Sequence, residues 1–165
     1  DAGAVKAWLR AQHAKTVRDR HRGAENRDFE LIRTEFHRWV DKNADDLKLK
    51  STDDFFRFTH DEMAFYTRQY QRLREASGAL KPGLEPVYHV AAFNFTLHYP
   101  LILAPLNTTD SADVIDRKVR VVATFLDILL ARRAAWVASE VKRKALESRI
   151  EQCWKQILPG PSGAK

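Results

Sequence analysis

The sequence predicts an all-α protein, an irregular bundle of about five to seven helices that ends in one long helix or a helix pair. Three observations predict this fold class. Apolar residues recur at steps of three or four in every long segment, which is the period of an amphipathic helix. No segment shows the alternation of a half-buried strand or a convincing hairpin turn. Residues 111–158 contain neither Gly nor Pro, so neither helix breaker interrupts that stretch.

The first two helices are expected at residues 3–22 and 27–43, and Gly23 suits the end of the first because glycine readily adopts a left-handed C-terminal cap. Each helix has an inner face of residues at helical spacing. In the first helix this face consists of Val5, Trp8 and Leu9, with Gln12 or Thr16. In the second it consists of Phe29, Ile32, Phe36, Trp39 and Val40.

A third helix is expected from Ser51 to the residue before Gly78. The Ser51 hydroxyl can cap this helix while Asp54 lies three residues further on, as in a capping box. The inner face is mostly aromatic and consists of Phe55, Phe58, Phe65, Tyr66, Tyr70 and Leu73. The segment ALKPGLEP at 79–86 is the one obvious linker, because it combines two prolines with a glycine.

The segment VYHVAAFNFTLHY at 87–99 is expected to be helical and to break at Tyr99, because a residue before proline disfavours the α conformation. Pro105 then stops a short helical turn. The final region, 111–158, is either one very long helix or two helices with a break near Trp136. Its reasonable N-caps are Ser111 and Asp110.

The stretch KVRVVATFLDILLARRAAW at 118–136 raises the question of a membrane. A spanning helix needs about 20 apolar residues, and Asp127 interrupts this run, so no membrane partner is expected. As a helix, the stretch belongs to a core face of Ile115, Val119, Val122, Leu126 and Leu129. The polar stripe on another face consists of Asp113, Arg117, Arg120, Thr124 and Asp127. Asp127 is then either solvated or a buried partner of an arginine.

Length and composition limit the classes of protein to which this chain can belong. The 165 residues, 44% of them hydrophobic, suit a single helical domain over residues 1–158 with a flexible tail at 159–165. Because the chain begins at Asp1 and not at Met, it is expected to be a fragment of a larger protein or a processed product. The first residues lack the apolar run of a signal peptide. The single Cys153 excludes an internal disulfide and suits a reducing cytosol, so a cytoplasmic location is expected.

Positive charge is concentrated at the two ends of the chain. The net charge is +4 over residues 1–27, −4 over 28–62, +1 over 63–110 and +5 over 111–165, which together give the +6 of the chain. Long basic helices can place Lys and Arg along a phosphate backbone, so DNA is the expected partner. The alternative is that these residues form solvated faces or pair with the acidic middle. The candidate nucleic-acid-binding residues are Arg10, Lys15, Arg18, Arg22, Arg132, Arg133, Lys142 and Arg143.

Catalytic motifs are absent: the sequence has no phosphate-binding glycine loop, no G-x-S-x-G and no H-E-x-x-H. No metal and no cofactor are expected in this chain. The residue order His89, Asn94, His98 is similar to the His-Asn-His motif of some nucleases. That motif needs a hairpin followed by a helix, whereas these residues lie in an apolar helical run, so the nuclease interpretation is rejected. THDE at 59–62 is expected to be exposed polar surface, because consecutive carboxylates point in different directions on a helix.

Two phrases resemble the helical region of GmrSD-type restriction proteins. AKTVRDRHRGAENRDFELIRTEFHRWV at 14–40 is similar to the segment that follows their nucleotide-binding domain. YPLILAPLNTTDSADVIDRKVRVVATFLDILLARR at 99–133 is similar to a later part, with an apolar run, an acidic loop and a helix that ends in two arginines. The resemblance covers most of residues 5–135. This chain departs from the family after Arg133, because Ala-Ala-Trp follows where the family usually carries an Asn a few residues on.

The resemblance implies a modification-dependent, antiviral DNA restriction system with a ParB-like NTPase domain and a His-Me finger nuclease. Neither the DGQQR-type motif of the NTPase nor the His-rich signature of the nuclease is found in these residues. The parent protein is therefore expected to be an NTP-dependent DNA endonuclease, and this chain to lack an active site. Two functions remain open. One is a DNA-contacting or modification-sensing region; the other is a scaffold that couples the NTPase and nuclease domains or forms a homo-oligomer, without binding DNA.

Overall fold

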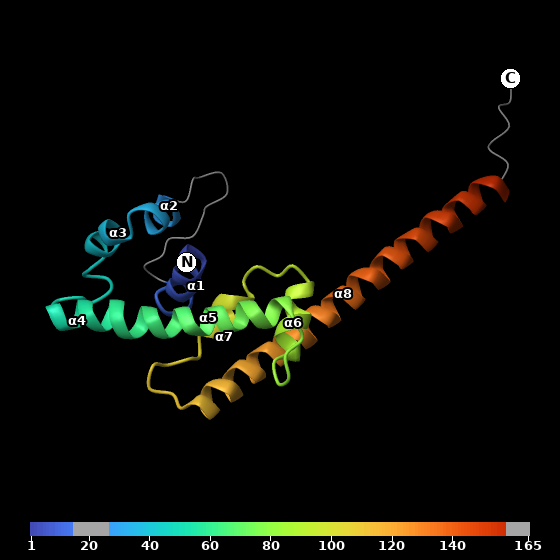
Figure 1. Ribbon diagram of the computed structural model, residues 1–165. Coiled ribbons are helices and arrows are strands. Elements are labelled where there is room, and N and C mark those ends of the chain that lie inside the picture. Colours follow the sequence, from blue (N-terminus) through green and yellow to red (C-terminus); the bar gives the residue numbers. More distant parts are fainter. Residues whose placement is uncertain (15–26, 158–165) are drawn as a thin grey trace, which may run out of the picture. The chain divides into compact units, whose positions relative to one another are not determined.

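A computed structural model of the protein describes residues 1–14 and 27–157 (Figure 1). Within these residues every regular element is helical and no strand occurs. The elements are α1 (Ala2–Gln12), α2 (Arg27–Thr34), α3 (Phe36–Lys42), α4 (Thr52–Phe56), the π-helix η1 (Arg57–Glu62), α5 (Met63–Gly78), α6 (Glu85–Ala92), α7 (His98–Leu103) and α8 (Ala112–Ile157). Because α4, η1 and α5 follow one another without a break, the described residues form seven continuous helices. The predicted all-α fold with a long last helix is confirmed.

The chain divides into two compact units, Asp1–Asp127 and Ile128–Lys165. The first unit contains α1 to α7 and the first part of α8, and the described part of the second unit is the remainder of α8. The single helical domain expected over residues 1–158 stays a prediction. The tail expected at 159–165 lies outside the described residues.

The core of the first unit is built around Trp8 of α1, whose side chain is fully buried. Its ring centroid lies 4.7 Å from that of Phe58 and 6.2 Å from that of Tyr66. Such aromatic pairs stabilise a core beyond the burial of apolar area alone. Since α1 contacts α2, α5 and α7, and α5 contacts α6 and α7, these two helices are central to the unit (Figure 1).

The predicted inner faces are mostly buried. The buried members are Trp8, Leu9, Ile32, Trp39, Val40, Phe58, Phe65, Tyr66, Leu73, Ile115, Val119 and Leu126. The partly exposed members are Val5, Gln12, Phe29, Phe36, Phe55, Tyr70 and Val122. The placement of Leu129 on the inner face is wrong, because its side chain is 49% exposed. It lies in the second unit, where α8 is the only element among the described residues.

The first helix ends at Gln12 and not at residue 22. His13 leaves the helix with φ of −124°, and its ring contacts the ring of Trp8 edge-on at 5.8 Å between centroids. Its Nε2 lies 3.6 Å from the Glu62 carboxylate of η1. The contact with Glu62 joins residues far apart in sequence, which apolar periodicity cannot indicate. The remainder of the expected helix, with Thr16 and Gly23, lies outside the described residues.

The helix expected at 27–43 is two helices, α2 and α3, because Glu35 adopts a non-helical conformation with φ of −138°. Its N–H donates to the carbonyl of Leu31 at 2.7 Å, and its carbonyl accepts from Arg38 and Trp39 at 3.0 and 3.2 Å. Glu35 therefore loses no backbone hydrogen bond at this break, which explains why no Gly or Pro is needed there.

The capping box at Ser51 is confirmed. The Asp54 N–H donates to the Ser51 hydroxyl at 3.2 Å, and the Ser51 N–H donates to the Asp54 carboxylate at 3.0 Å. The helix that follows includes the unanticipated η1, where the Thr59 hydroxyl donates to the carbonyl of Phe55 at 2.8 Å. It ends at Gly78, one residue later than expected.

The connections around α6 and α7 differ from the expectation at two prolines. Pro86 belongs to the first turn of α6, so the linker is shorter than predicted. The break expected at Tyr99 occurs earlier, after Ala92, and Asn94 there has a left-handed φ of 53°. Pro100 lies in the first turn of α7, where N–H groups have no intrahelical acceptor, so the ring costs no hydrogen bond. Pro105 follows the end of α7 as expected.

The last region is one helix, α8, without a break near Trp136. The Ser111 hydroxyl caps it by accepting from the N–H of Val114 at 3.4 Å. Asp127 is only 27% exposed, and its carboxylate lies 3.1 Å from Nδ1 of His89, so its partner is a histidine and not an arginine. In the described part of the chain, no helix has both the length and the apolar character required of a membrane span.

Candidate nucleic-acid interface

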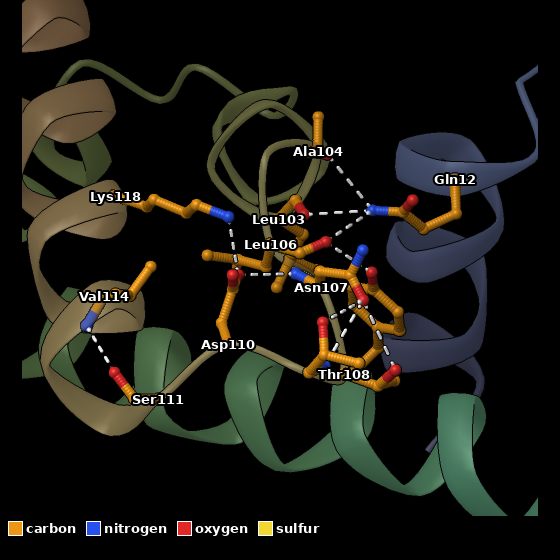
Figure 2. Close-up of polar contacts among 12 residues, drawn as sticks. Gln12, Leu103, Ala104, Leu106, Asn107, Thr108, Asp110, Ser111, Val114 and Lys118 are labelled. Atoms are coloured by element: carbon orange, nitrogen blue, oxygen red, sulfur yellow. Dashed lines mark hydrogen bonds and ion pairs between the residues drawn. The ribbon is translucent and has the colours of Figure 1, made fainter.

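The α7–α8 connection is hydrogen-bonded to side chains of α1 and α5, and Figure 2 shows its contact with Gln12 of α1. The Gln12 side-chain amide of α1 donates to the carbonyls of Leu103, Ala104 and Leu106 at 3.2, 3.2 and 3.4 Å. The Tyr66 hydroxyl of α5 donates to the carbonyl of Leu106 at 2.6 Å. Burial, with the neighbouring carboxylates of Glu62 and Asp110, raises the pKa of Tyr66 far above its ordinary range, so the hydroxyl remains a donor.

Asp110 organises the second half of this connection (Figure 2). Its carboxylate accepts from the N–H of Asn107 at 2.8 Å and from Nζ of Lys118 at 2.6 Å. The hydrogen bond from Lys118 lowers the pKa of Asp110, which stays ionised. Asp110 is therefore part of the loop framework, and Lys118 is not available to an external anion without loss of this pair.

Three of the predicted binding residues, Lys15, Arg18 and Arg22, lie outside the described residues. Arg10 lies in the last turn of α1 in the first unit and is partly exposed. Its guanidinium is 4.6 Å from the ring centroid of Phe29, and Nζ of Lys6 is 4.8 Å from the same centroid. Arg10 therefore packs on an aromatic ring within its own unit.

The other four predicted residues, Arg132, Arg133, Lys142 and Arg143, lie on α8 in the second unit, and all are exposed. Arg132, Arg133 and Lys142 form no ion pair with any residue that the structure describes. Arg143 pairs with the carboxylates of Glu140 and Glu147 on the same helix, which raises its pKa. Arg143 is thus partly neutralised, whereas the other three keep their full charge toward solvent.

The four residues do not share one face of α8. Arg132 and Arg143 are eleven residues apart and lie nearly on one line along the helix, because each residue turns about 100°. Arg133 lies about 100° from that line on one side, and Lys142 about 80° from it on the other. A single straight row of phosphates can therefore contact only a subset of them at once.

Two further cations belong with this set and were missed in the sequence. Lys144 and Arg149 are exposed on α8 and form no ion pair with a described residue. Between residues 128 and 152, six Lys and Arg side chains stand against three Glu, a net charge of +3. The run VKRK at 141–144 was the signal that could have included Lys144.

Large apolar side chains are also exposed to solvent on this part of α8. Trp136 is 65% exposed, Leu146 is 59% exposed and Ile150 is 48% exposed. No described residue of the second unit is buried. The helix therefore combines a positive charge with large apolar side chains that face water.

Among the described residues, histidines contact carboxylates in single pairs. His60 and Asp61 are exposed and contact each other at 2.9 Å, so the polar surface expected at THDE is confirmed there, whereas Glu62 is partly buried. His98 is buried, while His89 is exposed. No group of three or more potential metal ligands occurs in the described residues, and the absence of a cofactor stays a prediction.

Comparison with known proteins returned no family model, no curated protein and no solved structure that matches this chain.

Proposed function

We propose that this chain is the helical DNA-contacting region of a nucleotide-dependent DNA restriction system, in which α8 binds the phosphate backbone of DNA. One observation supports the DNA contact: in the second unit, five exposed cations of α8 form no ion pair with a described residue. They are Arg132, Arg133, Lys142, Lys144 and Arg149. The resemblance to GmrSD-type proteins supplies the rest of the proposal: the sensing of modified DNA, the neighbouring NTPase and nuclease domains, the antiviral role and the cytoplasmic location.

The proposed contact is electrostatic and independent of base sequence. Lys and Arg that neutralise phosphates release condensed counterions, so affinity falls by about 0.9 log unit per log unit of salt for each phosphate contacted. The cations are spread around α8, so they suit a backbone that curves past the helix or more than one strand. Contacts to phosphates position a protein without reading bases.

The test is binding of a labelled duplex DNA at several salt concentrations, measured by fluorescence anisotropy. Arg132→Glu with Arg133→Glu is expected to weaken binding roughly tenfold or more and to lower the salt slope by about 1.8, because two phosphate contacts are lost. Lys42→Glu with Lys50→Glu is the matched control, since both lysines are exposed in the first unit. Both double variants lower the formal net charge from +6 to +2.

Equal loss of affinity in both double variants would show that only the net charge of the protein matters, and it would contradict the assignment of α8 as the interface. The absence of wild-type binding even at low salt would reject DNA binding altogether. The sensing of a modification is tested in the same assay by comparing unmodified duplexes with duplexes that carry modified cytosine.

The exposed apolar side chains of α8 favour a second candidate, an interdomain or dimerisation scaffold without DNA binding. Trp136 is the largest of them, and a contact that covers it would release apolar surface from water. Light scattering after size exclusion should then give more than one copy, and Trp136→Ala should return the monomer. The control is Phe56→Ala in the first unit, because Phe56 is comparably exposed at 56%.

A further inference from the structure

A cavity of about 480 Å³ lies in the first unit, between α1, α5 and the connection from α6 to α7. Its volume is in the range of sites that hold small organic ligands, about 300–1,000 Å³. The lining brings together two cations, Lys6 and Arg10, and the aromatic side chains of Tyr70, Phe95 and Tyr99. No carboxylate is among its described lining residues. The chemistry of this lining suits a ligand that is both anionic and aromatic.

The two cations come from the same face of α1. Lys6 and Arg10 are four residues apart on α1, so they are neighbours on one face of the helix. Both approach the ring of Phe29, at 4.8 and 4.6 Å from its centroid, and this ring restrains their position. Both are partly buried, and a reduced contact with water strengthens their attraction for a phosphate.

The aromatic wall is formed by Tyr70 of α5 and Tyr99 of α7, whose ring centroids are 4.9 Å apart. Burial raises the pKa of Tyr70, so its hydroxyl remains a neutral donor near neutral pH. Gly3 makes room for this hydroxyl, because a Cβ atom at position 3 would lie 2.8 Å from Tyr70 Oη. The wall therefore depends on a glycine of α1.

Two residues of the α6–α7 region add polar groups to the lining. Asn94 is exposed and held in a left-handed conformation, with φ of 53°. His98 is only 6% exposed, and its Nδ1 contacts the carbonyl of Phe95. Burial lowers the pKa of His98, so the ring is neutral and Nδ1 carries the proton. Its Nε2 is then an acceptor, and it has no hydrogen-bond partner among the described residues.

We propose that this cavity binds a mononucleotide, with the phosphate on Lys6 and Arg10 and the base against Tyr70 and Tyr99. Bases stack on aromatic side chains whatever their identity, and Lys and Arg bind phosphate. The same chemistry is offered by a free nucleoside monophosphate and by one nucleotide of a single strand. This site is separate from the cations of the second unit, so it does not rest on DNA binding by α8.

The experiment is isothermal titration calorimetry of the full chain with adenosine, cytidine, guanosine and thymidine monophosphates. Inorganic phosphate and adenosine are titrated separately as the two halves of the ligand, and a short oligothymidylate is the single-stranded probe. The monophosphates are expected to bind at least about tenfold more tightly than phosphate or adenosine alone, because only they use both parts of the site. If only oligothymidylate binds, its loss in Lys6→Met but not in Arg132→Glu with Arg133→Glu would assign the cavity to nucleic acid.

Lys6→Met removes the charge but keeps an apolar stem against Phe29. It should lower the affinity for the probe that binds the wild type by about tenfold or more. Gly3→Ala should lower the same affinity, because the added methyl group displaces the Tyr70 hydroxyl. Lys50→Met is the matched control, and Arg132→Glu with Arg133→Glu should leave mononucleotide binding unchanged. Circular dichroism establishes that each variant is folded. The proposal is overturned if neither probe binds, if phosphate alone binds as tightly as the nucleotides, or if folded Lys6→Met binds as the wild type does.

Discussion

At the scale of single residues, the Tyr66 hydroxyl ties α5 to the start of the α7–α8 connection. It is buried and donates to the Leu106 carbonyl at 2.6 Å. Tyr66→Phe leaves that carbonyl only the longer contact with Gln12, at 3.4 Å. We expect the free energy of unfolding to fall by about 1 kcal/mol, measured by urea denaturation. Tyr88→Phe is the control because Tyr88 is 40% exposed, and an equal loss in both variants would contradict the assignment.

The capping box predicts the titration of Asp54. Hydrogen bonds from Ser51 and Lys50 lower the pKa of Asp54 from its ordinary value of 3.8 to about 2. A carboxyl with a lowered pKa stabilises the fold fully above its unfolded pKa, and the stabilisation is lost as pH falls through the folded value. The contribution of Asp54 is therefore complete above about pH 4 and is lost toward pH 2.

Carboxyl carbon NMR measures this pKa directly. Ser51→Ala removes the largest cause of the shift and should bring the pKa of Asp54 toward 3.8. Thr52→Ala changes the neighbouring residue without touching the box and should leave it near 2. A wild-type value near 3.8 would show that the box is not formed in solution.

At the scale of elements, two glycines near the end of α5 should respond to alanine with opposite signs. Gly83 has φ of +80°, and an added Cβ would lie 3.3 Å from the Arg120 guanidinium. Gly83→Ala should destabilise the protein by about 1 kcal/mol or more. Gly78 is helical, with no atom within 4 Å of an added Cβ, so Gly78→Ala should stabilise it by about 0.5 kcal/mol. Thermal unfolding followed at 222 nm compares the two, and the same sign in both would be inconsistent with these conformations.

At the scale of the whole molecule, all described buried residues lie in the first unit, the last being Leu126. A chain ending at residue 130 should therefore fold cooperatively, with an unfolding temperature close to that of the full chain, because its core is complete. It should lose the DNA affinity proposed for α8 and keep the mononucleotide site. Circular dichroism and calorimetry on the shortened chain check both statements. A shortened chain that does not fold would show that the second unit stabilises the first.

The sequence by itself determined the features that depend on residues within one or two turns. The helical class, the inner faces of Trp8 and Phe58, the capping box at Ser51 and the stop before Pro105 are all of this kind. They follow from side-chain periodicity, from a cap three residues away and from the missing N–H of proline. Among the candidate binding residues, the sequence indicated four cations of the last helix from the local density of Lys and Arg, and it missed Lys144 and Arg149.

Tertiary structure decided what depends on distant neighbours. The end of the first helix at Gln12 accompanies the contact of His13 with Glu62. The carboxylate of Asp127 pairs with His89 of α6, which is 38 residues away in the sequence. The cavity joins Gly3, Tyr70 and Tyr99, which no local pattern connects. The spacing of apolar residues indicates which face of a helix is apolar, but only tertiary packing determines whether another element covers that face. Leu129 was therefore predicted to be buried and is exposed.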